Sequence, residues 1–449
     1  MLDRKTAPGS VADCVGSGAT KAGERTPLST SGREAHYARH YCPRPRLRER
    51  FCANARPGIF NGLRQAAFCR RLGRLVSQPP GELTPGQRDW LRVRSYLQQH
   101  RHELALAAAE EKPARAKLAG TPLLAVPGGQ PARPVPLQDI GLDFHPADGV
   151  PALASYRDGA APAWPRRADG TRYLRYSDAV RELAAPAVFE NRATYRLTEA
   201  GLAGPAPRLG FTLGRYFDGI DTGEAAAHDY AASRLDGRPA ALRARLGDPC
   251  DLRRRPVNLA ISTLTLRLHR ATGQATFLLH WRDPALVGHA GGLYQVIPVG
   301  VFQPSGEAAW NERVDFSLWR CMIREFAEEL RGRPEDYDSE VCPVDYGSWP
   351  FARRMTEALD RGQIRVWCLG LGVDPLSYAT DLLTVAVIDS GTFDELFSLH
   401  PRRNAEGQVL AAREFAAGVI DRLVTREPVQ AAGAAVLRLA WTHRDVLTG

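Results

Sequence analysis

The sequence lacks the long apolar runs and leader patterns that direct proteins to membranes. No stretch of the 449 residues approaches the ~18 consecutive apolar residues that a membrane-spanning helix needs. The N-terminal residues also lack the apolar core of a secretory signal peptide. We therefore expect a protein without a membrane partner, located in the cytoplasm.

Several common chemical signatures are absent as well. The eight cysteines form no C-x-x-C pair, and several stand in apolar or helical stretches, which indicates reduced thiols and not a disulfide framework. The sequence contains no phosphate-binding P-loop, no G-x-S-x-G nucleophile elbow and no H-E-x-x-H helix. The enzyme classes that depend on these motifs are therefore not indicated.

Positive charge is concentrated at the start of the chain. The formal net charge is +9, yet residues 1–118 hold 22 Lys and Arg against 10 Asp and Glu, so the remainder is slightly acidic. A basic arm on an acidic body favours an anionic partner such as DNA. A solvated Arg-rich tail without a partner explains the same composition.

Composition divides the chain into four segments. Residues 1–60 are polar, basic and rich in Gly, Pro and Ser, so we expect a disordered tail. Residues 61–118 form a basic helical arm, with helices predicted over Gly62–Val76 and Asp89–Glu111. Residues 119–170 hold nine prolines from Pro122 to Pro165 and suggest an extended linker. Residues 171–449 have the pattern of an α/β domain.

Strands and helices alternate irregularly in this last segment. Asn258–His269 and Ala275–Trp281 alternate between apolar and polar residues around a turn at Gly273, which predicts a β-hairpin. Further strands are expected over Leu293–Phe302, Gln363–Leu369 and Leu382–Asp389. Helices are expected over Asp178–Leu183, Thr222–Leu235, Asp315–Leu330, Phe393–Leu399, Ala411–Val424 and Val436–Asp445. The fold class is α/β or α+β, with a mixed sheet between helices.

The predicted helix, with Asp315 as its N-cap and Gly332 at its end, has two distinct faces. Its apolar face, directed to the core, consists of Trp319, Met322, Ile323, Phe326 and Leu330. Glu325, Glu328 and Glu329 share a second face, where a bound Mg²⁺ or Mn²⁺ would relieve their repulsion and activate water against a phosphoryl group. Alternatively this is a solvated face, with Arg324 and Glu328 as an ordinary surface ion pair.

The segment Arg324-Glu325-Phe326-Ala327-Glu328-Glu329-Leu330 resembles the second half of the Nudix hydrolase signature. The preceding Pro298-Val299-Gly300 is similar to the turn that leads into the helix of that family. The resemblance implies a Nudix-like domain in which Glu325, Glu328 and Glu329 bind Mg²⁺ or Mn²⁺. It also implies that Arg324 orients these glutamates and that Arg324 and Glu328 take part in catalysis.

The first half of the signature is degenerate. The family's glycine and upstream glutamate would fall on Trp310 and Phe316, and neither matches. An insertion separates Gly300 from the helix, and Glu307 and Glu312 within it are the candidates to replace the missing carboxylate. The resemblance therefore implies the fold more firmly than the reaction.

Two functions are compatible with these observations. The first is a metal-dependent hydrolase of a nucleoside diphosphate linked to another group. The second is a non-catalytic regulator that senses a nucleotide-like ligand and contacts DNA through its basic N-terminal arm. The second is similar to actinobacterial transcriptional regulators with a Nudix-like C-terminal domain, although their DNA-binding module is not recognisable here.

Other polar residues are given structural roles. His280 is expected to be a hydrogen-bonded histidine within a sheet. Glu224 and His228 stand four residues apart on a predicted helix, where Asp221 and Glu224 also have the spacing of a capping box. Helix capping and surface pairing account for these three residues without a function.

Overall fold

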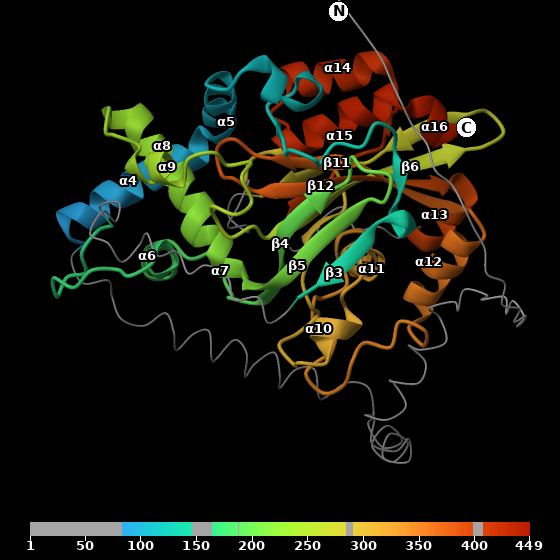
Figure 1. Ribbon diagram of the computed structural model, residues 1–449, viewed down its shortest axis with the longest axis horizontal. Coiled ribbons are helices and arrows are strands. Elements are labelled where there is room, and N and C mark those ends of the chain that lie inside the picture. Colours follow the sequence, from blue (N-terminus) through green and yellow to red (C-terminus); the bar gives the residue numbers. More distant parts are fainter. Residues whose placement is uncertain (1–82, 146–163, 187, 284–290, 398–406) are drawn as a thin grey trace, which may run out of the picture. The chain divides into compact units, whose positions relative to one another are not determined.

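The computed structural model describes residues 83–145, 164–186, 188–283, 291–397 and 407–449 (Figure 1). All of them belong to the compact unit formed by residues 78–449. The predicted tail 1–60 and helix Gly62–Val76 lie outside the described residues. Within the described residues, no helix is long and apolar enough to cross a membrane.

A mixed β-sheet forms the centre of the unit. Its longest strands are β6 (Leu259–His269), β11 (Ile364–Val373) and β12 (Thr380–Asp389). β12 runs parallel to β6 and antiparallel to β11, which makes the sheet mixed. The path β1-β11-β12-β6-β7-β14 is completed by β2 on β11 and β10 on β6. The shorter strands are β1 (Leu124–Ala125), β2 (Val135–Pro136), β7 (Gln274–Phe277), β10 (Val299–Val301) and β14 (Arg413–Glu414).

Alternate residues of β12 enter two different apolar cores, because successive side chains of a strand point to opposite faces. Leu382 packs in the same cluster as Phe326 of α11 (Leu318–Arg331), whereas Leu383 packs with Val436 of α15 (Ala431–Thr442). Figure 1 shows α14 and α15 on one side of the sheet and α11, α12 and α13 on the other. The bounds of the remaining helices are Ala417–Arg426 for α14, Pro350–Asp360 for α12 and Ser390–Phe397 for α13. The predicted α/β class, with a mixed sheet between helices, is confirmed.

A second sheet and the N-terminal helices complete the unit. β3 (Gly141–Phe144) pairs in parallel with β5 (Arg208–Arg215), which pairs antiparallel with β4 (Ala193–Gly201). The described residues of the proline-rich segment therefore contribute β1, β2 and β3 to the two sheets. The boundaries of the four predicted segments stay predictions. Helices α4 (Pro85–Gln99) and α5 (Arg101–Glu110) share an apolar cluster with α8 (Ala225–Asp236).

The predicted elements differ from the observed ones mainly where local geometry interrupts a pattern. The hairpin is confirmed as β6 and β7, with Gly273 in the left-handed conformation. The predicted helix Asp89–Glu111 is divided into α4 and α5 by His100, whose ψ of 20° leaves the helical region. The predicted strand Leu293–Phe302 is broken into β9 (Tyr294–Gln295) and β10, with Pro298, which has no backbone N–H, between them. The first part of predicted helix Ala411–Val424 is strand β14.

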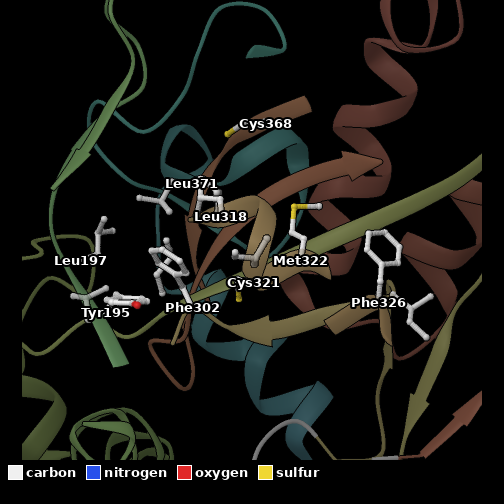
Figure 2. Packing of buried hydrophobic residues seen from close by; sticks show 14 of the residues in the cluster. Tyr195, Leu197, Phe302, Leu318, Cys321, Met322, Phe326, Cys368 and Leu371 are labelled. Carbon is white, nitrogen blue, oxygen red and sulfur yellow. The ribbon is translucent and has the colours of Figure 1, made fainter. Parts of the chain in front are cut away.

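Helix α11 is held against the sheet by the apolar stripe predicted from its sequence. Met322, Ile323, Phe326 and Leu330 are buried, and Trp319 is partly buried, with its indole N–H donating to Thr356 of α12. Figure 2 shows Leu318, Cys321 and Met322 of α11 together with Phe302 and Leu371 in one apolar cluster. The polar face of α11 is consequently fixed in position next to β10.

Candidate functional site

Helix α11 begins and ends at residues that fix its orientation. The Ser317 hydroxyl accepts a hydrogen bond from the backbone N–H of Arg320, so Ser317 is the N-cap and the prediction of Asp315 as N-cap is wrong. Gly332 ends the helix with a φ of 64°, as predicted. Asp315 lies before the cap, where its carboxylate is free to pair with a residue two turns along the helix.

Arg324 and Asp315 form the buried centre of the site. Their Nη1 and Oδ1 atoms are 3.2 Å apart, and both side chains are buried. Asp315 also accepts from the Tyr346 hydroxyl at 2.7 Å and from the backbone N–H of Ser305 at 2.8 Å. The Arg324 guanidinium donates further to the Gln303 carbonyl and the Tyr346 hydroxyl. Arg324 therefore joins α11 to the segment 303–315 that precedes it.

The electrostatics of this centre favour a permanent cation. Burial alone would lower the pKa of Arg324, but Tyr346, Cys321 and Asp315 nearby raise it well above its usual value.

The predicted replacements for the missing carboxylate, Glu307 and Glu312, are not the acidic partner of Arg324. Glu307 instead accepts from the backbone N–H of Ala193 at 2.8 Å and pairs with Arg215.

The three glutamates of α11 are directed to three different partners. The Glu325 carboxylate lies over Gly300 of β10, where a Cβ atom would stand 1.8 Å from the Glu325 Cδ. Glu328 accepts a hydrogen bond from the Tyr337 hydroxyl at 2.7 Å. Glu329 is buried, accepts from the backbone N–H of Val299 at 2.7 Å and lies 3.5 Å from Nδ1 of His280. The helix spacing brings the carboxylates to one side, and each of them has a different neighbour.

The arrangement of the three glutamates differs from the ligand set that a divalent cation requires. Mg²⁺ needs near-octahedral oxygen ligands at about 2.0–2.1 Å. Across the described parts of the chain, no three His, Cys, Asp or Glu side chains are grouped so that they could hold a metal ion. As placed, Glu325, Glu328 and Glu329 do not fit such a cation, and their assignment as ligands stays a prediction.

Residues around Glu328 make this part of the site half-buried and mixed in charge. Burial, followed by the neighbouring Glu328, raises the pKa of the Tyr337 hydroxyl far above its usual value. Beside it, Glu335 accepts from Gln303 at 3.2 Å and pairs with Arg192 at 2.5 Å. The Tyr337 hydroxyl therefore keeps its proton and donates a hydrogen bond to Glu328.

Comparisons with known proteins leave the family of the chain open. No family model matches the sequence, and no curated protein matches it. Among solved structures, a NUDIX hydrolase from Alicyclobacillus acidocaldarius is similar, with 15% sequence identity and a TM-score of 0.25. The match covers 43% of this chain and 95% of that one. Neither value is high enough to assign a family, so the function has to be argued from the side chains.

The predicted surface roles of Glu224 and His228 are wrong, because both side chains are buried. Glu224 receives two hydrogen bonds from the Arg101 guanidinium, at 2.9 and 2.8 Å. His228 stacks on Trp90 of α4 with ring centroids 5.1 Å apart. Asp221 forms no capping box and accepts from the Ser177 backbone N–H, within a π-helical turn over Ile220–Glu224. Arg101 of α5 supplies the positive charge that pairs with Glu224, but the sequence alone does not indicate that these two residues meet.

His280 lies within a sheet, as predicted. It is buried in β8 (His280–Arg282), which pairs with β9 and β13 (Gly407–Val409). Its ring reaches Glu329, a contact that links this small sheet to α11.

Proposed function

We propose that this chain is a Nudix-like protein that does not hydrolyse nucleotides and acts in the cytoplasm as a ligand-sensing regulator that contacts DNA. The observation that carries the proposal is that two of the three α11 carboxylates accept hydrogen bonds from protein donors. Glu328 is engaged by Tyr337, and Glu329 by Val299 and His280. The carboxylates that a metal-dependent hydrolase would share around one cation thus serve as acceptors for protein donors.

Physical chemistry favours the carboxylates staying with these partners. A hydrogen bond to a charged group contributes about 1.5–3 kcal/mol. A cation that gathered Glu328 and Glu329 would first break their bonds to Tyr337 and Val299. It would also leave buried polar groups without partners, which adds a desolvation cost of about 1–3 kcal/mol for each group. The site is therefore better suited to holding α11, β10 and the following loop together than to turnover.

The docking of α4 and α5 supports a regulatory role. Arg101, at the start of α5, forms a buried two-pronged ion pair with Glu224, and Arg94 of α4 lies 3.9 Å from the same carboxylate. Removing one partner of such a buried pair costs about 3–5 kcal/mol, because the other charge stays buried and unpaired, so the docking of the two helices depends on this contact. A change of state in the domain that alters the contact would therefore act on α4 and α5, the described helices that follow the basic N-terminal residues in the sequence.

The absence of hydrolysis is tested with the full chain. Purified protein is incubated with Mg²⁺ or Mn²⁺ and a panel of nucleotide sugars and dinucleoside polyphosphates, and released phosphate or nucleoside monophosphate is measured. The proposal predicts the same background release for the wild type and Glu328→Gln. Metal-dependent release by the wild type that Glu328→Gln abolishes would establish the hydrolase instead.

The DNA contact is tested by the salt dependence of binding to duplex DNA, measured by fluorescence anisotropy. The logarithm of affinity falls with log[salt] by about 0.9 for each phosphate contacted. Replacing four closely spaced arginines by Gln should make this slope shallower. The four are Arg44, Arg46, Arg48 and Arg50.

Two exposed arginines of the described unit provide a control for the loss of positive charge outside the N-terminal segment. The side chains of Arg253 and Arg361 are 89% and 68% exposed. Replacing both by Gln removes positive charge elsewhere and should leave the salt slope unchanged. Equal effects of the two sets of substitutions, or no DNA binding by the wild type, would contradict the DNA contact.

A further inference from the structure

The loop that joins α11 to α12, residues 332–349, folds back onto the carboxylate face of α11. Tyr337 lies in the first third of this loop, where its hydroxyl donates to Glu328 at 2.7 Å and lies 3.4 Å from the Arg324 carbonyl oxygen. Both acceptors belong to α11, one turn of the helix apart. A residue of the loop thus occupies the space beside Glu328 from which a ligand would approach it.

The position of Tyr337 is fixed by its neighbours in the loop. The Arg333 guanidinium lies 4.6 Å from the centre of the Tyr337 ring and 4.6 Å from that of Trp349. The two rings are themselves in edge contact, with centroids 5.6 Å apart. Contacts of a guanidinium with aromatic faces are attractive, so Arg333 and Trp349 clamp the Tyr337 ring between the two ends of the loop.

The backbone beside Tyr337 is also specifically shaped. Asp336 accepts a hydrogen bond from the N–H of Asp338 at 3.0 Å, which closes a tight turn around Tyr337. Asp338 has a φ of 54°, in the left-handed region that Asp enters more readily than most residues. The turn directs the Tyr337 side chain towards α11, and the clamp retains it there.

We propose that Tyr337 is a built-in occupant of the α11 carboxylate face and is the reason why this face does not take a divalent cation. Its hydroxyl donates a hydrogen bond to Glu328, and this hydrogen bond substitutes for the positive charge that a metal would supply. Glu325 and Glu328 lie on the same side of the helix, one turn apart. Without the Tyr337 hydroxyl, Glu328 would lose this hydrogen-bond donor. This inference rests on the proposed non-hydrolytic function and names the element that enforces it.

Gly300 allows the Glu325 carboxylate of the same face to lie close to the neighbouring strand. Because Gly300 has no side chain, the Glu325 carboxylate lies directly against the β10 backbone, where any Cβ would overlap it. The carboxylates of Glu325 and Glu328 are both only partly buried. The Tyr337 hydroxyl donates to Glu328, whereas the Arg324 guanidinium keeps its own contacts with Asp315, Gln303 and Tyr346 when that hydroxyl is removed.

The experiment measures Mn²⁺ binding to the full chain from the EPR signal of free Mn²⁺, with no substrate present. Tyr337→Phe removes the hydroxyl and retains the ring that Arg333 and Trp349 hold. We expect it to bind Mn²⁺ roughly tenfold or more tightly than the wild type, as the loss of one hydrogen bond to a charged group predicts. Adding Glu328→Gln to Tyr337→Phe should cancel the gain.

Tyr346→Phe is the matched control, because it removes a buried hydroxyl from the same site that contacts Asp315 and Arg324 but none of the glutamates. It should bind Mn²⁺ as the wild type does. Arg333→Gln keeps the hydroxyl and loosens the clamp, so it should give a smaller gain and carries the test if Tyr337→Phe fails to fold.

The possible outcomes separate this inference from the proposed function. No gain in Tyr337→Phe, an equal gain in Tyr346→Phe, or tight Mn²⁺ binding by the wild type that depends on Glu328 would overturn the role of Tyr337. If Tyr337→Phe does not fold, no gain in Arg333→Gln overturns it. Nucleotide hydrolysis by the wild type would instead overturn the proposed function, whatever the variants bind.

Discussion

Arg101 and Glu224, which are 123 positions apart in the chain, form a two-pronged ion pair with distances of 2.9 and 2.8 Å. Their side chains are only 6% and 3% exposed. The pair joins α5 to the π-helical turn that precedes α8, and it is reinforced by the apolar contacts between α4 and α8. Helices α4 and α5 are therefore part of the domain.

Arg101→Gln should lower the free energy of unfolding by about 3–5 kcal/mol, because it leaves the Glu224 carboxylate buried with its main partner removed. Arg208 and Asp143 provide the control, since they form an equally close two-pronged pair whose side chains are 60% and 36% exposed. Arg208→Gln should cost less than about 1 kcal/mol. Urea unfolding of the two variants checks the difference, and equal costs would show that burial is not what gives the first pair its strength.

The stability of the domain should fall in acid because of His228. Burial, followed by the cation of Arg94, lowers the pKa of His228 to about 3, from an unfolded value of 6.5. The unfolded chain therefore binds the proton first, so the contribution of His228 is fully present above pH 6.5 and is lost as the pH falls towards 3. Within this window the loss approaches roughly 1.4 kcal/mol per pH unit.

His228→Gln isolates this effect from the other groups that titrate in acid. Asp221 acts in the opposite direction, because burial raises its pKa to about 6 and its protonation favours the folded state as the pH falls. The difference in unfolding free energy between wild type and His228→Gln should shrink steadily from pH 7 to pH 4. A difference that is independent of pH would rule out a neutral buried His228.

Replacing glycines by alanine should distinguish a glycine packed against rigid backbone from one packed against a flexible side chain. A Cβ at Gly223 would meet the Ser377 backbone oxygen at 2.1 Å, whereas at Gly300 it would meet the end of the Glu325 side chain. Gly223→Ala should therefore be strongly destabilising, by about 3 kcal/mol or more, and Gly300→Ala by about 1 kcal/mol. At Gly391, where nothing lies within 4 Å, Ala should be neutral or stabilising.

The destabilisation caused by Gly300→Ala should also depend on the Glu325 side chain. In a Glu325→Ala background, Gly300→Ala should have almost no effect, because the group that it displaces is gone. Thermal or urea unfolding of the four proteins in this cycle measures the coupling. Additive effects would mean that the Glu325 carboxylate does not lie over Gly300 in solution.

Arg324→Lys should not behave as a conservative change. The guanidinium reaches Asp315, the Gln303 carbonyl and the Tyr346 hydroxyl from one planar group, whereas an ammonium cannot keep all three contacts. We expect a loss of about 2–4 kcal/mol in the free energy of unfolding. Arg331→Lys, at the exposed end of the same helix, should change it by less than about 0.5 kcal/mol. Equal effects would contradict the buried network.

Periodic features of the fold were predictable because they depend on neighbouring residues. Alternation around Gly273 gave the β6–β7 hairpin, and helical spacing gave the buried stripe of α11. The break at His100 and the N-cap at Ser317 were missed, since they depend on backbone angles at single residues that the pattern does not encode.

Partners in the site could not be predicted, because they come from distant positions. The helix spacing places Glu325, Glu328 and Glu329 on one side of α11, but it does not state that Tyr337, Val299 and His280 approach them. Likewise Asp315 could be noticed as an acidic residue near the helix start, yet its contact with Arg324 requires the chain to turn before Ser317. The donors that engage each glutamate decide what the motif can do.

The state of the α11 glutamates in the presence of a divalent metal decides most directly between the proposed regulator and a hydrolase. A crystal of the full chain soaked in Mn²⁺ and measured at the manganese absorption edge answers this by anomalous scattering. We predict no anomalous peak among Glu325, Glu328 and Glu329, with the Tyr337 hydroxyl still bonded to Glu328. A peak coordinated by two or more of these carboxylates, with Tyr337 displaced, would contradict the account.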